Sequence, residues 1–165
     1  MSKITPCLWF DGQAEEAAKF YVSVFPDSRI DEVMRSPADT PSGPEGSVLL
    51  VRFTIGGEPF TALNGGPEFR FSEATSFMVD CADQAEVDRL WEALSVDASA
   101  EQCGWLKDRY GLSWQIIPRA LPDLLADSDP AKAKRVMEAM LEMKKIDVAG
   151  LERARDGELS GRAAS

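Results

Sequence analysis

Few residues of this chain could carry out covalent or metal chemistry, because it contains no histidine. Ser-His-Asp and Cys-His catalysis and His-ligated metal sites are therefore excluded. The cysteines, Cys7, Cys81 and Cys103, are far apart and form no Cys-x-x-Cys motif, which indicates reduced thiols. No pair of carboxylates stands where the predicted strands would favour general acid–base catalysis, and we assign no catalytic residue.

Aromatic, hydroxyl and amide side chains alternate along two predicted strands, and alternate residues of a strand share a face. In the first strand Thr5, Cys7 and Trp9 share one face, and in a later strand Phe60 and Asn64 do. The sequence does not determine the register of the first strand. A slip of one residue would turn Thr5, Cys7 and Trp9 to the opposite face.

The last predicted strand, residues 113–118, places Gln115 on the face opposite Trp114 and Ile116, which we expect helices to cover. A curved sheet with the polar and aromatic candidates inside forms a cup of the kind that binds small molecules. The alternative is that Gln115 and Asn64 only satisfy backbone groups. The candidate ligand-binding residues are Thr5, Cys7, Trp9, Phe60, Asn64, Ser76, Trp105 and Gln115.

Two similar runs of elements must position these residues. The first run is strand, helix and three strands, at residues 4–10, 13–25, 28–35, 48–55 and 60–64, with a hairpin turn at Gly56-Gly57. The second run repeats this order at residues 74–80, 83–94, 99–102, 103–107 and 113–118. The triplet starting at Gln13 recurs at Gln84, which favours an internal repeat.

The predicted fold class is α+β, with two βαβββ modules forming a curved mixed sheet with an open cup, and a C-terminal helical extension. Asp129-Pro130 is a typical helix start within this extension. We expect one structural domain overall. Its predicted segments are residues 1–66 and 72–119 for the modules, 120–156 for the helical extension and 157–165 for a disordered tail.

The charge of the chain excludes some classes of partner. Among 165 residues, 28 are acidic and 18 basic, so the net charge is −10. Nucleic acids and anionic membranes need clustered cations, so we expect neither as a partner. No apolar run approaches the ~20 residues of a membrane span, and the opening residues lack a signal-peptide core. These observations predict a cytoplasmic protein.

Several long stretches resemble one known family. They are residues 4–12, 14–17, 20–21, 62–67, 103–111, 112–116 and 143–147. Together these stretches resemble the vicinal oxygen chelate superfamily of glyoxalases, bleomycin-resistance proteins and dioxygenases. The resemblance is greatest to its PhnB-like branch, labelled 3-demethylubiquinone-9 3-methyltransferase, and it covers roughly residues 3–153.

The resemblance implies two βαβββ modules, each an incomplete barrel around a cavity, and a homodimer. The metalloenzymes of this superfamily hold a divalent metal at positions that match Thr5, Asn64, Ala74 and Gln115 here. None of these residues is an imidazole or carboxylate ligand, so we expect no metal and no other cofactor. The chain also lacks the glycine-rich turn typical of an S-adenosylmethionine site.

Three functional hypotheses follow from these observations. The first is a metal-free protein that binds a small molecule, by sequestration or as a sensor, with Trp9, Trp105, Phe60 and Gln115 in the cup. The second is an enzyme, either a metal-assisted isomerase, lyase or dioxygenase, or the methyltransferase of the family label. The third is a dimeric scaffold whose cup is filled by its own side chains.

Overall fold

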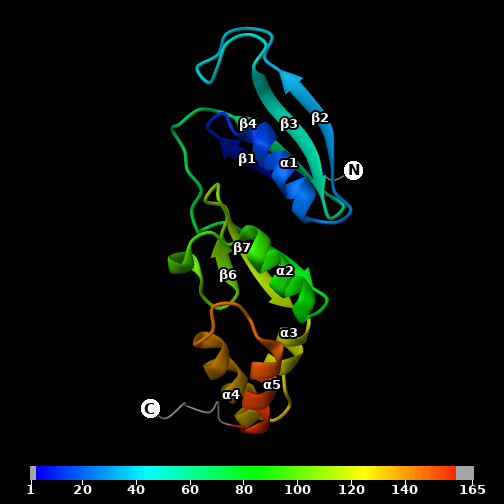
Figure 1. Cartoon of the computed structure of the whole chain (residues 1–165), viewed down its shortest axis with the longest axis vertical. Coiled ribbons are helices and arrows are strands. Elements are labelled where there is room, and N and C mark those ends of the chain that lie inside the picture. Colours follow the sequence, from blue (N-terminus) through cyan, green and yellow to red (C-terminus); the bar gives the residue numbers. More distant parts are fainter. Residues whose placement is uncertain (1–2, 159–165) are drawn as a thin grey trace. The chain divides into compact units, whose positions relative to one another are not determined.

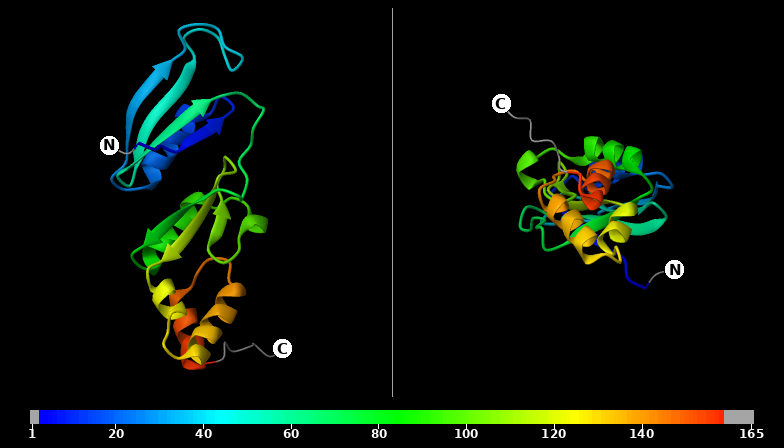
Figure 2. Two further views of the ribbon diagram at one scale, coloured as in Figure 1. Left: turned by 180° about the vertical axis from the view of Figure 1, so that it is seen from behind. Right: turned by 90° about the horizontal axis from the view of Figure 1, so that it is seen from below.

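The computed structural model describes residues 3–158 and divides the chain into two compact units, residues 1–71 and 72–165 (Figure 1). In each unit a helix lies against one face of a sheet (Figure 2). The α+β fold class with C-terminal helices is confirmed. Among the described residues, no helix combines the length and apolar character that a membrane crossing requires. The finer division of the chain into four segments stays a prediction.

The first unit has the predicted order of strand, helix and three strands. Its elements are β1 (Cys7–Phe10), α1 (Ala14–Val24), β2 (Arg29–Arg35), β3 (Val48–Ile55) and β4 (Glu58–Asn64). The sheet order is β1-β4-β3-β2, with β1 parallel to β4 and the other pairs antiparallel. Gly56 and Gly57 have φ of +54° and +85°. Two positive φ values suit the predicted two-residue hairpin turn.

The core of the first unit lies between α1 and the sheet. Ala17, Ala18 and Tyr21 of α1 are fully buried, as are Val51 and Phe53 of β3. The small alanines let the helix backbone approach the strands, while the Tyr21 and Phe53 rings stack with centroids 6.3 Å apart. Burial of this apolar helix face therefore determines which side of the sheet is covered.

The second unit has one strand fewer than predicted. Its first part contains β5 (Ser76–Cys81), α2 (Gln84–Leu94), a 3₁₀ helix η1 (Ala98–Ala100), β6 (Trp105–Lys107) and β7 (Ser113–Pro118). The sheet order is β5-β7-β6, with β5 parallel to β7.

The strand predicted at residues 99–102 is wrong, because η1 occupies the first half of this stretch. The Asp97 carboxylate accepts hydrogen bonds from the backbone N and the Oγ of Ser99, at 2.9 and 2.6 Å. This local bonding stabilises a turn in place of an extended ladder. A single bridge from Gln102 to Trp105 is the β-pairing recorded for that stretch.

Helix α2 lies where the sequence predicts it, and its N-cap is Asp83. The Asp83 side chain accepts from the Glu86 backbone N at 2.9 Å. Leu90 and Leu94 of α2 are fully buried, as is Ile116 of β7. The covered face of the second sheet is thus the one that the apolar face of α2 requires.

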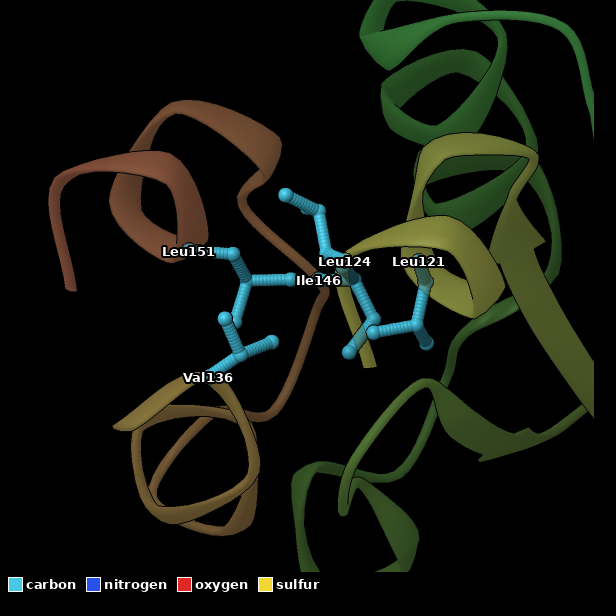
Figure 3. Packing of buried hydrophobic residues seen from close by; sticks show 5 residues of the cluster. All are labelled: Leu121, Leu124, Val136, Ile146 and Leu151. Atoms are coloured by element: carbon cyan, nitrogen blue, oxygen red, sulfur yellow. The ribbon is translucent and has the colours of Figure 1, made fainter. Parts of the chain in front are cut away.

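Three helices complete the second unit: α3 (Ala120–Leu125), α4 (Pro130–Leu141) and α5 (Val148–Asp156). Asp129 caps α4 by accepting from the Ala131 backbone N at 2.9 Å, and Pro130 stands in the first turn as predicted. Apolar side chains from the three helices and the α4–α5 connection meet in one cluster (Figure 3). They are Leu121, Leu124, Val136, Ile146 and Leu151.

The helical extension is joined to the second module by specific hydrogen bonds. The Gln84 amide donates to the Ile146 carbonyl and accepts from the Val148 backbone N, both at 2.9 Å. The Gly104 backbone N donates to the Lys144 carbonyl at 2.7 Å. The start of α2 therefore positions the segment between α4 and α5. The tail predicted at 157–165 lies outside the described residues from 159 onward.

Candidate functional site

The register of the first sheet decides which candidate residues share a face. Strand β1 pairs in parallel with β4, with Trp9 opposite Leu63 and Phe10 opposite Asn64. Paired residues point to the same side of a sheet. Cys7 and Trp9 therefore lie on the side away from α1, which we call the first open face, whereas Phe60 and Asn64 lie on the side facing α1.

The prediction that Phe60 and Asn64 share a cup face with Cys7 and Trp9 is therefore wrong. Their side chains are in the covered core, where Phe60 is 8% exposed and Asn64 is 5% exposed. Alternation along each strand was read correctly, but the relation between the two strands depends on their hydrogen-bonded register. Thr5 precedes β1 and is exposed. A ligand contact by any of these residues stays a prediction.

Asn64 has a structural role that uses both ends of its amide. Its Oδ1 accepts from the Ala14 backbone N at 2.9 Å, and its Nδ2 donates to the Val48 carbonyl at 2.9 Å. The first bond satisfies a free N–H in the first turn of α1. The alternative that this residue satisfies backbone groups is thus confirmed for Asn64.

Trp9 is held against its own chain. Its indole Nε1 donates to the Gly66 carbonyl at 2.8 Å, and its ring lies 4.9 Å, centroid to centroid, from Phe69 in an edge-on contact. A Cβ on Gly65 would come within 2.3 Å of the Trp9 ring. Glycine at position 65 therefore allows the indole to lie on the backbone, which accounts for the pair Gly65-Gly66 in this stretch.

The first open face carries one apolar row and one charged row. Pairing across the four strands aligns Trp9, Leu63, Leu50 and Met34 in the apolar row. The neighbouring row contains Cys7, Thr61, Arg52 and Glu32. Arg52 and Glu32 form an ion pair at 2.9 Å. The two charged side chains of this row thus neutralise each other.

The second sheet brings three candidates together. Gln115 is opposite Trp105 of β6, and Ser76 is opposite Ser113 of β7. Ser76, Trp105 and Gln115 therefore share the side away from α2, which we call the second open face. All three are half-buried. The opposite side contains Trp114, 2% exposed, so the prediction that helices cover Trp114 and not Gln115 is confirmed.

The amide of Gln115 is engaged by a side chain. Its Nε2 donates to Ser76 Oγ at 2.9 Å across the β5–β7 pair. The Gln115 carbonyl oxygen has no recorded donor among the described residues, so it keeps an acceptor on the second open face. The alternative that Gln115 satisfies a backbone group is not supported by this bond.

The buried carboxylate of Asp108 was not selected from the sequence. It is 2% exposed and accepts from the backbone N of Tyr110 and of Leu112, at 2.8 and 3.1 Å, and from Trp114 Nε1 at 2.9 Å. These bonds hold the turn between β6 and β7, where Gly111 has φ +84°. The Asp-x-x-Gly pattern is a turn signal that predicts such a role.

Lys107 and Ser113 were also missed, and both lie in the row of Ser76. Lys107 is opposite Ser113 on the second open face and forms an ion pair with Glu73. Ser113 is 1% exposed, and its buried Oγ has no hydrogen-bond partner among residues 3–158. Lysine and serine are too common on surfaces for sequence alone to distinguish them.

The positions that match metal ligands in the superfamily do not fit a metal ion. Asn64 bonds the backbone in the covered core, Ala74 has no side-chain donor, and Gln115 bonds Ser76. Within residues 3–158, no three His, Cys, Asp or Glu side chains come together as a ligand set. We therefore derive no chemistry through a metal.

The thiols of Cys7 and Cys81 do not have the environment of activated nucleophiles. Burial raises the pKa of Cys81 to about 12, and the carboxylates of Glu86 and Asp80 act in the same direction. Burial also raises the pKa of Cys7 above its usual value. Nucleophilic cysteines need a lowered pKa. Neither residue therefore supports covalent catalysis.

Comparison with known proteins places the chain in a family. The family model described as 3-demethylubiquinone-9 3-methyltransferase matches residues 2–117. A PhnB protein from Bacillus cereus, titled a putative 3-demethylubiquinone-9 3-methyltransferase, is 34% identical with a TM-score of 0.60. The match covers 71% of this chain and 99% of that chain. The chain belongs to this PhnB-like family, and the resemblance found in its sequence is confirmed.

Two further solved structures are similar. A protein from Pseudomonas aeruginosa is 21% identical, with a TM-score of 0.56, covering 72% of this chain and 98% of that chain. A glyoxylase/bleomycin resistance protein/dioxygenase domain from a Frankia species is 12% identical with a TM-score of 0.46, covering 72% of this chain and 92% of that one. No curated protein matches the chain. The family match ends before α3, so the helical extension lies outside it.

Proposed function

We propose that this protein binds a small organic molecule on the second open face, without a metal ion. The observation that carries the proposal is the grouping of Ser76, Gln115 and Trp105 on one side of the β5-β7-β6 sheet. Small-molecule sites combine apolar surface with a few directed polar groups. Trp105 supplies the first, and the Gln115–Ser76 pair supplies the second.

The polar pair is already oriented for recognition. Because Gln115 Nε2 donates to Ser76 Oγ, the Gln115 carbonyl oxygen is left as an acceptor and the Ser76 hydroxyl hydrogen as a donor. Trp105 is directly opposite Gln115 in the register, so its half-buried ring lies beside these groups. A ligand on this face would stack on the indole and bond the pair.

The proposal is tested by following tryptophan fluorescence during titration with neutral aromatic and quinone-like compounds. We expect quenching in the wild type and in Trp9→Phe, and loss of the signal in Trp105→Phe. Gln115→Ala should weaken binding by about tenfold, because it removes the acceptor and releases Ser76. Unchanged fluorescence across the library, or quenching that survives in Trp105→Phe, contradicts the proposal.

The enzymatic alternative is tested in the same assay. The family description names a methyltransferase. S-adenosylmethionine is therefore titrated alongside the library. Binding of this cofactor would favour the methyltransferase over a simple binding protein.

The homodimer implied by the resemblance stays a prediction. Native mass spectrometry of the purified chain measures it directly. We expect twice the mass of one chain, and a monomer at micromolar concentration would contradict the expectation.

A further inference from the structure

The geometry points to a carboxylate on the ligand of the second open face: we propose that Lys107, Ser113 and Ser76 bind it while the aromatic part of the ligand lies against Trp105. This inference rests on the proposed function, because it names the class of ligand for the same face. The class is an aromatic carboxylate of the size of benzoate.

The first support is the hydroxyl of Ser113. It is buried with no hydrogen-bond partner in the part of the chain that the structure describes, although buried polar atoms in native proteins are nearly always satisfied. An unpartnered buried hydroxyl destabilises the folded state. Strand register places Ser113 on the second open face, between Ser76 and Lys107. The hydroxyl is thus a donor without an acceptor in the middle of the row.

The second support is the ion pair beside this hydroxyl. Lys107 lies on β6, and Glu73 lies in the turn before β5, so their ion pair joins the two outer strands at the end of the sheet where β7 begins with Ser113. The Lys107 side chain is 28% exposed and the Glu73 side chain is 64% exposed. The ion pair with Glu73 shows that a carboxylate can bind the Lys107 ammonium at this end of the sheet.

The ion pair is of a kind that a ligand can replace. Exposed ion pairs are weak, because water screens them and two long side chains must be ordered. Asp97 is a second carboxylate on which the charge of Lys107 acts. Hydrogen bonds from Ser99 lower the pKa of Asp97 most, and the positive charge of Lys107 lowers it further. Replacing Glu73 by a ligand carboxylate keeps the charge of Lys107 neutralised.

The third support is that Ser76, Ser113 and Lys107, which lie in one row across the sheet, all offer hydrogen-bond donors. The Ser76 Oγ accepts from Gln115, so its own hydrogen is available. Together with the Ser113 hydroxyl and the Lys107 ammonium, it forms a set that an acceptor-only carboxylate satisfies. Trp105 and Lys107 are two residues apart on β6 and share the face, which separates their positions by about 7 Å. That spacing suits an aromatic ring that carries a carboxylate.

The test compares benzoate with benzamide by isothermal titration calorimetry at low salt. Both probes have the same ring and nearly the same shape, but only benzoate is charged. We expect wild-type protein to bind benzoate at least about tenfold more tightly than benzamide, because a charge-assisted hydrogen bond is the stronger one. Lys107→Met should remove this preference, whereas Lys134→Met should keep it. Lys134 is a matched control, an exposed lysine paired with Glu138 on α4.

Two further variants give effects that a purely structural role would not produce. Glu73→Gln should tighten benzoate binding about threefold or more, because it removes the competing carboxylate, whereas Glu138→Gln should leave the affinity unchanged. Ser113→Ala should weaken benzoate binding and yet raise the melting temperature of the ligand-free protein. These readouts do not depend on whether Lys107→Met folds.

The outcomes separate this inference from the proposed function. Equal affinity for benzoate and benzamide, or no binding of benzoate to wild type and Glu73→Gln, overturns the carboxylate subsite. The proposed function survives either result if a neutral ligand of the library quenches Trp105. Failure of the whole library as well as benzoate overturns both.

Discussion

The two open faces of this protein follow the same plan of strand pairing but differ in how their polar groups are satisfied. On the first face Trp9 bonds the Gly66 carbonyl, and Arg52 pairs with Glu32. On the second face the buried hydroxyl of Ser113 has no partner among the described residues, and the partly exposed ion pair of Lys107 and Glu73 lies beside it. This difference is the reason why we propose the second face, and not the first, as the ligand-binding one.

The two candidate amides show the same difference. Asn64 bonds two backbone groups on the covered side of its sheet, whereas Gln115 bonds a serine on the open side of its own. Both were plausible ligand contacts on residue type alone. Repetition of a module therefore does not repeat the role of its amide, because Asn64 bonds the backbone and Gln115 bonds a side chain on an open face.

The largest effect is expected from Asn64→Ala. It leaves the Ala14 backbone N and the Val48 carbonyl without partners, which should lower the free energy of unfolding by about 2–3 kcal/mol. Urea denaturation followed by circular dichroism measures it. Gln115→Ala is the matched control and should cost less than about 1 kcal/mol, because its amide bonds an accessible hydroxyl. Equal costs would remove the distinction between the two amides.

A smaller effect is expected from Gly65→Ala. The new Cβ would meet the Trp9 ring at 2.3 Å, so the indole must move, at a cost of about 1–2 kcal/mol. The same substitution in a Trp9→Ala background should cost much less, and a double-mutant cycle by thermal unfolding measures the coupling. Additive effects of the two substitutions would show that Trp9 is not held by Gly65.

The smallest effect is expected for the reactivity of two cysteines, Cys7 on the first open face and Cys81 on the covered face of the second sheet. Cys7 is exposed, whereas Cys81 is fully buried on the covered face with its pKa raised to about 12. Iodoacetamide at pH 8 should therefore modify Cys7 and leave Cys81 unmodified until the protein unfolds, as read by mass spectrometry. Rapid labelling of native Cys81 would contradict its burial.

The same thiol also makes stability depend on pH. The unfolded chain loses the Cys81 proton above about pH 9, whereas the folded thiol keeps it until about 12. Stability should therefore fall as pH rises through this window. Cys81→Ala should make the decline shallower, and an unchanged slope would argue against the raised pKa.

Much of the fold was predictable from short patterns. The strand at residues 48–55, the Gly56-Gly57 turn and the helix start at Asp129-Pro130 all depend on residues close in sequence, and all three are confirmed. The predicted strand at 99–102 failed for a local reason as well, because the Asp97–Ser99 bonds favour a turn. The hydrophobic residues of this stretch follow no clear helical or strand period, so its sequence does not distinguish a strand from a turn.

The sequence by itself determined the order of elements in the first unit, the family and the side of β7 that α2 covers, because each depends on residue types at fixed local spacing. Only the tertiary structure decided that Asn64 belongs to the core of the first unit. The same is true of Ser113 and its place between Ser76 and Lys107. Alternation has a period of two within one strand, and its phase relative to a neighbouring strand is defined only when their backbones pair.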